Sequence, residues 1–125
     1  MREMRTPIML NTIGLGWAGP LLLDMGTEAH KKKHIKGILS AEDMWCQGFS
    51  EPEHGSDLGN AQLKAVKDGD EYVLNGSKIW TTHGHCAKYM ILLARTNFEA
   101  SNKYAGLSFF LSAMYVGGVE TTKIW

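Results

Sequence analysis

Two short polar stretches contain the residue types from which a ligand site is built. Residues 46–57 (CQGFSEPEHGSD) combine hydroxyls, carboxylates and backbone amides on a loop rich in proline and glycine. Residues 78–82 (KIWTT) join a large aromatic plate to two hydroxyls. Backbone donors that face an aromatic ring and hydroxyls suit a flat molecule with a polar edge. We therefore expect a site for such a ring if the fold brings these two stretches together.

Each stretch also has a purely structural interpretation. Pro, Gly, Ser and Asp are ordinary turn residues, and Trp and Thr are common in strands. Alternation along a strand would place Trp80 and Thr82 on one face and Thr81 on the other. The residues alone leave both interpretations open, because the hydroxyls matter for binding only if another element faces them.

The histidines are the strongest candidates for metal ligands. Residues 83–86 (HGHC) put two imidazoles and a thiol close together, and His54 offers a further nitrogen. Alternate positions of a strand do not close a tetrahedral site by themselves, and no Cys-x-x-Cys pair accompanies them. We therefore expect no metal site.

The carboxylates of Glu51, Glu53 and Asp57 are close in sequence but need not converge in space. The sequence contains no nucleophile elbow, no phosphate loop and no Rossmann glycine pattern. The residue pattern therefore identifies no catalytic base.

The composition excludes several classes of function. A chain of 125 residues, 44% of them hydrophobic, suits one globular domain or one domain with a piece of another. The 13 basic and 13 acidic residues cancel, so we expect no nucleic-acid partner. Polar residues, glycines and Pro20 interrupt the longest apolar stretch, residues 7–25, so we expect no membrane span. Two cysteines, and a start without the apolar core of a signal peptide, indicate a cytoplasmic protein with free thiols.

The residue patterns change from helical to strand-like near Trp45. Pro20 suits the first turn of a helix, and Thr27 suits the N-cap of the next one. The later residues alternate or form apolar runs between turn residues, and Asn75-Gly76 indicates a hairpin. The predicted helices are residues 6–18, 21–25 and 28–38, and the predicted strands are residues 62–67, 71–74, 77–80, 89–94, 107–111 and 119–124. The predicted fold class is α+β, with short helices followed by an antiparallel β-barrel or sandwich.

Taken in this order, residues 50–57 and 68–82 resemble two signatures of the acyl-CoA dehydrogenase family of flavoproteins. The likeness spans residues 15–124. It implies that residues 1–44 are the C-terminal part of the family's N-terminal helical domain, and that residues 45–125 are most of its middle β-domain. By this resemblance we expect the sequence to be a fragment that lacks the family's C-terminal domain.

The resemblance also implies a binding site for FAD. The backbone of Gln47, Phe49 and Ser50, together with the Ser50 hydroxyl, would meet the pyrimidine edge of the flavin. Trp80 would pack along the ring system, and Thr82 would hydrogen-bond near its N5 atom. These hydrogen bonds would stabilise the negative charge that the flavin gains as it accepts hydride.

Two further residues enter the site by the same resemblance. Thr81 is counted with the cofactor-binding residues, although the family commonly has an aliphatic residue there. Ser56 would lie where the thioester arm of an acyl-CoA substrate passes.

The activity implied by the family is α,β-dehydrogenation of an acyl-CoA thioester to the 2-enoyl-CoA, as in fatty-acid β-oxidation. Family members pass their electrons to an electron-transferring flavoprotein and assemble as homo-oligomers. The family's catalytic glutamate lies in the C-terminal domain and no carboxylate here matches it, so we expect the isolated chain to be inactive. Two alternatives stay open: a related flavoprotein such as an oxidase, and a non-catalytic β-module that binds a partner through an open sheet edge.

Overall fold

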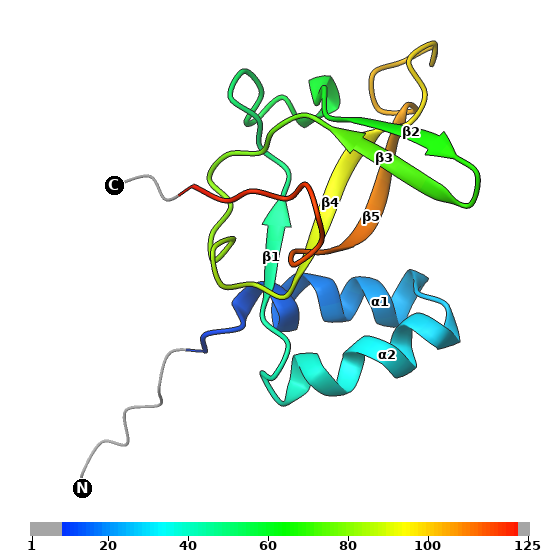
Figure 1. The fold of residues 1–125 in the computed structure, drawn as a ribbon. Coiled ribbons are helices and arrows are strands. Elements are labelled where there is room, and N and C mark those ends of the chain that lie inside the picture. Colours follow the sequence, from blue (N-terminus) through cyan, green and yellow to red (C-terminus); the bar gives the residue numbers. More distant parts are fainter. Residues whose placement is uncertain (1–8, 123–125) are drawn as a thin grey trace, which may run out of the picture. The chain divides into compact units, whose positions relative to one another are not determined.

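The computed structural model describes residues 9–122 of the chain. These residues fall into two compact units that divide between Trp45 and Cys46. We call them the helical unit (residues 9–45) and the β-unit (residues 46–122). Figure 1 shows the helices of the first unit and the sheet of the second, with the loops that join its strands.

The helical unit begins with a π-helical turn, η1 (Gly14–Ala18), which continues into α1 (Gly19–Met25). Pro20 lies in the first turn of α1, as its missing N–H predicts. The second α-helix, α2 (Glu28–Leu39), begins where the Thr27 side chain accepts a hydrogen bond from the backbone N–H of His30 at 3.2 Å. Both helix starts inferred from the sequence are therefore confirmed. Residues 6–8 of the first predicted helix lie outside the described residues.

The buried amide of Asn11 links three parts of the helical unit. The Asn11 Nδ2 atom donates to the carbonyls of Ile38 (3.2 Å) and Asp43 (3.0 Å). Its Oδ1 atom accepts from the backbone N–H of Trp45 at 3.1 Å. The end of α2 and the segment after it are therefore fixed to the residue that precedes the first helical turn.

The β-unit is built on five strands. They are β1 (Trp45–Gly48), β2 (Lys64–Asp68), β3 (Glu71–Asn75), β4 (Tyr89–Arg95) and β5 (Leu107–Ala113), with a short 3-10 helix, η2 (Leu58–Asn60), between β1 and β2. The strand order is β1-β4-β2-β3, and β5 also pairs with β4. β4 is antiparallel to β5 along its whole length, and β2 and β3 form an antiparallel hairpin. Gly69, with φ of 59°, makes the turn of that hairpin, between the strands predicted at residues 62–67 and 71–74.

The succession of helices and a β-domain is confirmed, but the sheet is open and mixed rather than a closed antiparallel barrel or sandwich. The contact between β2 and β4 is parallel and pairs Lys64 with Arg95. Residues 76–88 form no strand. They carry the chain from the end of β3 to the start of β4, which therefore runs parallel to β2.

The hairpin predicted at Asn75-Gly76 is wrong. β3 ends at Asn75, and residues 77–80 are not a strand. Gly76 packs closely against Leu63, and the backbone N–H of Ile79 donates to the Ser50 carbonyl at 2.9 Å. Residues 76–79 therefore lie along the loop after β1 instead of returning along β3. The strand predicted at 119–124 is also missing: residues 119–122 are not in a strand, and 123–124 lie outside the described residues.

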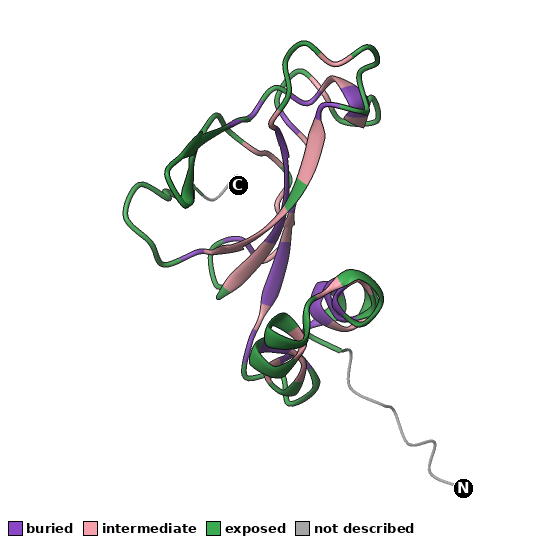
Figure 2. Ribbon diagram, turned by 90° about the vertical axis from the view of Figure 1, so that its right-hand side faces the viewer, coloured by how far each residue is buried: buried purple, intermediate pink, exposed green. Residues whose placement is uncertain are grey.

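β4 is the centre of the β-unit. Its apolar run is buried from Ile91 to Ala94, as the unbroken hydrophobic pattern predicted. β3, in contrast, is exposed at all five positions. Figure 2 shows this difference between the buried middle and the exposed outer strand of the sheet. No helix among residues 9–122 is both long and apolar enough to cross a lipid bilayer.

Candidate functional site

The loop after β1 lies directly beside the segment that carries Trp80. The backbone N–H of Ile79 donates to the Ser50 carbonyl at 2.9 Å, and the Lys78 Nζ atom donates to the Phe49 carbonyl at 3.0 Å. The two polar stretches of the sequence are therefore adjacent in space, although about thirty residues separate them. No strand ladder joins them. The donors are the backbone N–H of Ile79 and the Lys78 ammonium, and the acceptors are carbonyl oxygens of the loop after β1.

Glu51 holds this arrangement from the inside. Its Oε1 atom accepts from Lys78 Nζ (2.8 Å) and from the backbone N–H of Leu63 (2.8 Å). Its Oε2 atom accepts from the backbone N–H of Gln62 at 2.6 Å. Burial by itself would raise the pKa of Glu51, but the Lys78 ammonium and the two backbone donors outweigh it and hold the pKa below its usual value. An ionised, buried carboxylate that accepts three hydrogen bonds is a structural anchor rather than a base exposed to a substrate.

Trp80 stands out from the surface. Its side chain is 72% exposed, and its backbone has φ of 58°, in the left-handed region that bulky residues rarely occupy. The Thr82 N–H donates back to the Trp80 carbonyl at 2.9 Å, and the Gly84 N–H donates to the Thr81 carbonyl at 2.9 Å. Residues 80–84 are therefore a series of tight turns, and the predicted strand alternation of Trp80 and Thr82 is wrong. Strained backbone and exposed aromatic surface concentrate at sites that bind ligands.

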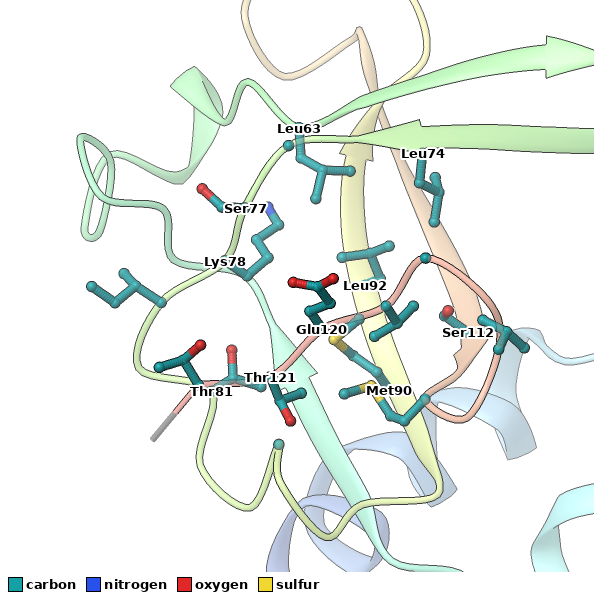
Figure 3. Close-up of a pocket in the computed structure, with 18 of the residues that line it drawn as sticks. Leu63, Leu74, Ser77, Lys78, Thr81, Met90, Leu92, Ser112, Glu120 and Thr121 are labelled. Atoms are coloured by element: carbon teal, nitrogen blue, oxygen red, sulfur yellow. The ribbon is translucent and has the colours of Figure 1, made fainter. Parts of the chain in front are cut away.

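Trp80, Thr81 and Thr82 line one side of a cavity of about 930 Å³ in the β-unit. Figure 3 shows Thr81 and Thr121 on one side of the view, with Met90 and Leu92 beside the strand β4 on the other. The sheet side of the lining is mostly apolar, with Ser112 of β5 among its residues, and residues 80–82 bring hydroxyls to it. Such a division suits a ligand with an apolar face and a polar edge.

The polar groups around this region are available for a ligand. Within residues 9–122, the hydroxyls of Ser50, Thr81 and Thr82 make no hydrogen bond to another protein group, although Ser50 itself does not line the cavity. The indole of Trp80 presents a large aromatic surface next to two of them. These hydroxyls and the exposed Trp80 indole suit a flat ring with hydrogen-bonding atoms on its edge.

The remaining predicted site residues differ in their placement. Gln47 lies half-buried on β1. The Phe49 ring packs edge-on against Phe109 at a centroid distance of 5.4 Å, so its side chain belongs to the sheet packing and only its backbone can serve a ligand. Ser56 is exposed on the loop before η2 and does not line the cavity. The next residue, Asp57, forms an ion pair with Lys103, which lowers the pKa of the Asp57 carboxyl.

Three charged residues that hold the site region were not among the predicted site residues. Besides Glu51 and Lys78, the buried Arg95 donates to the carbonyls of Gly59 (2.7 Å) and Ala61 (3.0 Å). Arg95 ends an otherwise wholly apolar strand, and a charge at such a position was the signal that could have indicated a buried role. In the part of the chain that the structure describes, no three or more His, Cys, Asp or Glu side chains gather as a metal site.

Comparison with known proteins agrees with this geometry. Residues 46–125 match the family model described as "Acyl-CoA dehydrogenase, middle domain". The chain belongs to the acyl-CoA dehydrogenase family. It is 37% identical over 118 residues to the acyl-CoA dehydrogenase IpdE1 of Mycobacterium tuberculosis strain H37Rv, covering 94% of this chain and 30% of that protein. The chain thus spans about a third of the length of this curated relative of the acyl-CoA dehydrogenase family.

Solved structures of the acyl-CoA dehydrogenase family share the same arrangement. A protein titled "Tcur3481-Tcur3483 steroid ACAD" superimposes with a TM-score of 0.84 at 39% identity, covering 86% of this chain and 28% of the other. A glutaryl-CoA dehydrogenase from Mycobacterium smegmatis, titled as a complex with FADH2, matches with a TM-score of 0.71 at 26% identity. That match covers 81% of this chain and 24% of the other. The fold of the β-unit is therefore that of the acyl-CoA dehydrogenase middle domain.

Proposed function

We propose that this chain carries one wall of the FAD site of an acyl-CoA dehydrogenase. The observation that carries the proposal is the direct contact between the loop at Phe49–Ser50 and the segment that presents Trp80. Membership of the family supports FAD as the flat, polar-edged group, and the similar glutaryl-CoA dehydrogenase was solved with the reduced cofactor. The unpaired hydroxyls and the exposed indole fit that group.

Each residue then has a distinct task toward the flavin. The Ser50 hydroxyl and the backbone at Gln47 and Phe49 hydrogen-bond its pyrimidine edge. The Trp80 indole packs along the ring system, and Thr81 and Thr82 offer hydroxyls beside it. Donors placed at a ring that gains negative charge stabilise the reduced state more than the oxidised state.

When bound, FAD supplies the hydride acceptor for α,β-dehydrogenation of an acyl-CoA thioester. The chain's own part is to bind, orient and shield. We assign it no catalytic base, because abstraction of the α-proton needs a positioned and available carboxylate. Glu51 is buried in its ion pair and Asp57 is paired with Lys103, and Glu120, a carboxylate that lines the cavity, is not the family's catalytic glutamate, which the resemblance places in the C-terminal domain. We therefore propose that the isolated chain has little or no dehydrogenase activity.

The whole protein's partners follow from the same proposal. The substrate is an acyl-CoA, whose arm passes Ser56, and the product enters a fatty-acid β-oxidation type of sequence. An electron-transferring flavoprotein removes the electrons, the full-length protein forms homo-oligomers, and it works in the cytoplasm.

Reduction of the FAD-loaded full-length enzyme by acyl-CoA, followed by transfer of the electrons to such a flavoprotein rather than to oxygen, separates a dehydrogenase from an oxidase.

An FAD titration of the 125-residue chain followed by amide NMR tests the proposal. We expect shifts at Ser50 and at residues 80–82, and weaker binding by Trp80→Ala. Aromatic packing of about 0.5–1.5 kcal/mol corresponds to a two- to tenfold rise in Kd. Trp17→Ala is the matched control, because Trp17 is an exposed tryptophan of the helical unit. Shifts confined to other residues, or equal affinities of the two variants, contradict the proposal.

A second candidate is favoured by the exposed outer strand. β3 ends the strand order and leaves Tyr72, Val73 and Leu74 at least 38% exposed. Such a strand can add a partner's strand to the sheet. If the chain binds no FAD and Trp80→Ala changes nothing measurable, this non-catalytic β-module becomes the better description.

A further inference from the structure

Lys78 is a buried cation at the edge of the candidate flavin site. Its side chain is 5% exposed, and that of its partner Glu51 is 4% exposed. A lysine on a surface segment ordinarily keeps its ammonium in water. Here the ammonium instead binds two oxygen atoms of the loop after β1: the Glu51 carboxylate at 2.8 Å and the Phe49 carbonyl at 3.0 Å.

The bond to the Phe49 carbonyl fixes the direction of a neighbouring donor. The C=O of Phe49 and the N–H of Ser50 belong to one planar peptide unit, and the described residues contain no cis peptide bond. In a trans peptide the C=O and the N–H point in opposite directions. Because Lys78 Nζ holds the carbonyl, the Ser50 N–H is directed away from Lys78.

The next peptide unit is fixed from the same segment. The Ser50 carbonyl accepts from the Ile79 N–H at 2.9 Å, and the Glu51 N–H is already used by the His54 carbonyl at 2.8 Å. Within residues 9–122 the Ser50 N–H has no protein acceptor. Two consecutive peptides are thus locked, and the single donor they leave open is the Ser50 N–H.

The stability of the fold does not by itself explain why Lys78 and Glu51 form a buried ion pair. Apolar residues of similar volume often replace a buried ion pair at little or no loss of stability, so such a pair is weak support for a purely structural role. What apolar residues cannot do is hold the Phe49 carbonyl in one direction. Glu51 in turn keeps the ammonium in place, because its carboxylate is itself held by the N–H groups of Gln62 and Leu63.

We propose that Lys78 and Glu51 are positioning residues for the flavin: they set the Phe49–Ser50 peptide so that the Ser50 N–H is presented as a donor to the ring's polar edge. Neither residue touches the reacting atoms. The inference rests on the proposed function, because the acceptor of the Ser50 N–H is taken to be the flavin. The inference gives Lys78 and Glu51 a role in cofactor binding in addition to their role in the packing of the β-unit.

The first test uses the unchanged 125-residue chain. Hydrogen exchange is measured for the Ser50 and Glu51 amides with and without FAD. We expect exchange at Ser50 to slow at least fivefold when FAD binds, whereas Glu51, whose N–H already has an acceptor, stays within twofold. If FAD binds and the Ser50 amide is not protected, the positioning role is overturned.

The second test removes the pair without leaving a buried charge. The double variant Lys78→Met/Glu51→Gln shortens the side chain at position 78 by one atom, keeps the length at position 51 and neutralises both charges together. We expect a folded β-unit with a shifted Ser50 amide and a five- to tenfold higher Kd for FAD, the effect of one lost hydrogen bond. Lys67→Met, which neutralises an exposed lysine on β2, is the control and should bind FAD like the unchanged chain.

The outcomes separate this inference from the proposed function. If the unchanged chain binds no FAD, the proposed function fails, and the inference, whose acceptor is the flavin, fails with it. If the unchanged chain binds FAD and the folded double variant binds it equally well, only the positioning role is overturned. If the double variant does not fold, the exchange of the Ser50 amide in the unchanged chain decides.

Discussion

The Lys78 ammonium lies 2.8 Å from the Glu51 carboxylate, and both side chains are almost fully buried. Around this contact three segments meet: the loop after β1, the residues that lead into β2, and the segment that leads to Trp80. The candidate flavin wall is therefore held by charge-assisted hydrogen bonds rather than by a strand ladder. Such bonds are shorter and stronger than those between neutral groups.

Removing one partner of this pair should be costly. We expect Glu51→Leu to lower the free energy of unfolding by about 3–5 kcal/mol, because it strands the Lys78 charge and frees two buried N–H groups. Urea unfolding at pH 7 measures the change. Glu53→Leu, at an exposed position two residues away, should stay within about 0.5 kcal/mol. Equal losses in the two variants would show that the buried pair does not hold the loop.

The same carboxylate should give the chain an acid-sensitive stability. The folded-state pKa of Glu51 lies below the unfolded value of about 4.5, so its contribution is fully present above that value. It is lost as the pH falls through the folded-state pKa. As the pH is lowered below 5, we expect the urea midpoint of the unchanged chain to fall. The midpoint of Glu51→Gln should fall less steeply over the same range. Parallel pH profiles of the two proteins would contradict the assignment.

The sequence predicted local features well where the chain decides its own conformation. Thr27 as an N-cap, Pro20 in a first helical turn, and the buried run of β4 all depend on neighbouring residues, and all are present. Asn75-Gly76 has the composition of a hairpin turn but does not form one. There the contacts of Gly76 with Leu63 and of Ile79 with Ser50 prevail, and both partners are distant in sequence.

The site was predictable only in part for the same reason. Adjacency of the loop at Ser50 and the segment at Trp80 was expected, and the structure shows it. The burial of Glu51 and Lys78 was not predicted. A charged residue in a loop or an expected strand is assumed to face solvent unless its partner is known. Trp80 was expected on a strand face, whereas a positive φ, invisible in the sequence, exposes its ring.

Arg95 should be as important for the loops of the β-unit as Glu51 is for the flavin wall. It binds the carbonyls of Gly59, Ala61 and Lys103, so it joins two loops to the end of β4. We expect Arg95→Met to lower the free energy of unfolding by about 2–4 kcal/mol, because three carbonyls lose a charged donor. Amide exchange should also quicken in residues 57–62 and 97–106. Unchanged exchange in those loops would mean that other contacts fix them.

The two cysteines should differ sharply in reactivity. Burial, with a smaller contribution from nearby Cys86, raises the pKa of the Cys46 thiol to about 12. Cys46 is buried and packs against Ala87 and Met114, whereas Cys86 is exposed. Because the thiolate is the reactive species, a maleimide probe at pH 8 should label Cys86 and leave Cys46 unmodified in the folded chain. Mass spectrometry of peptides measures both sites, and denaturation in urea should make them react equally. Labelling of Cys46 at the rate of Cys86 without denaturant would show that β1 opens readily, which would leave the loop at Phe49–Ser50 too mobile to present a fixed donor.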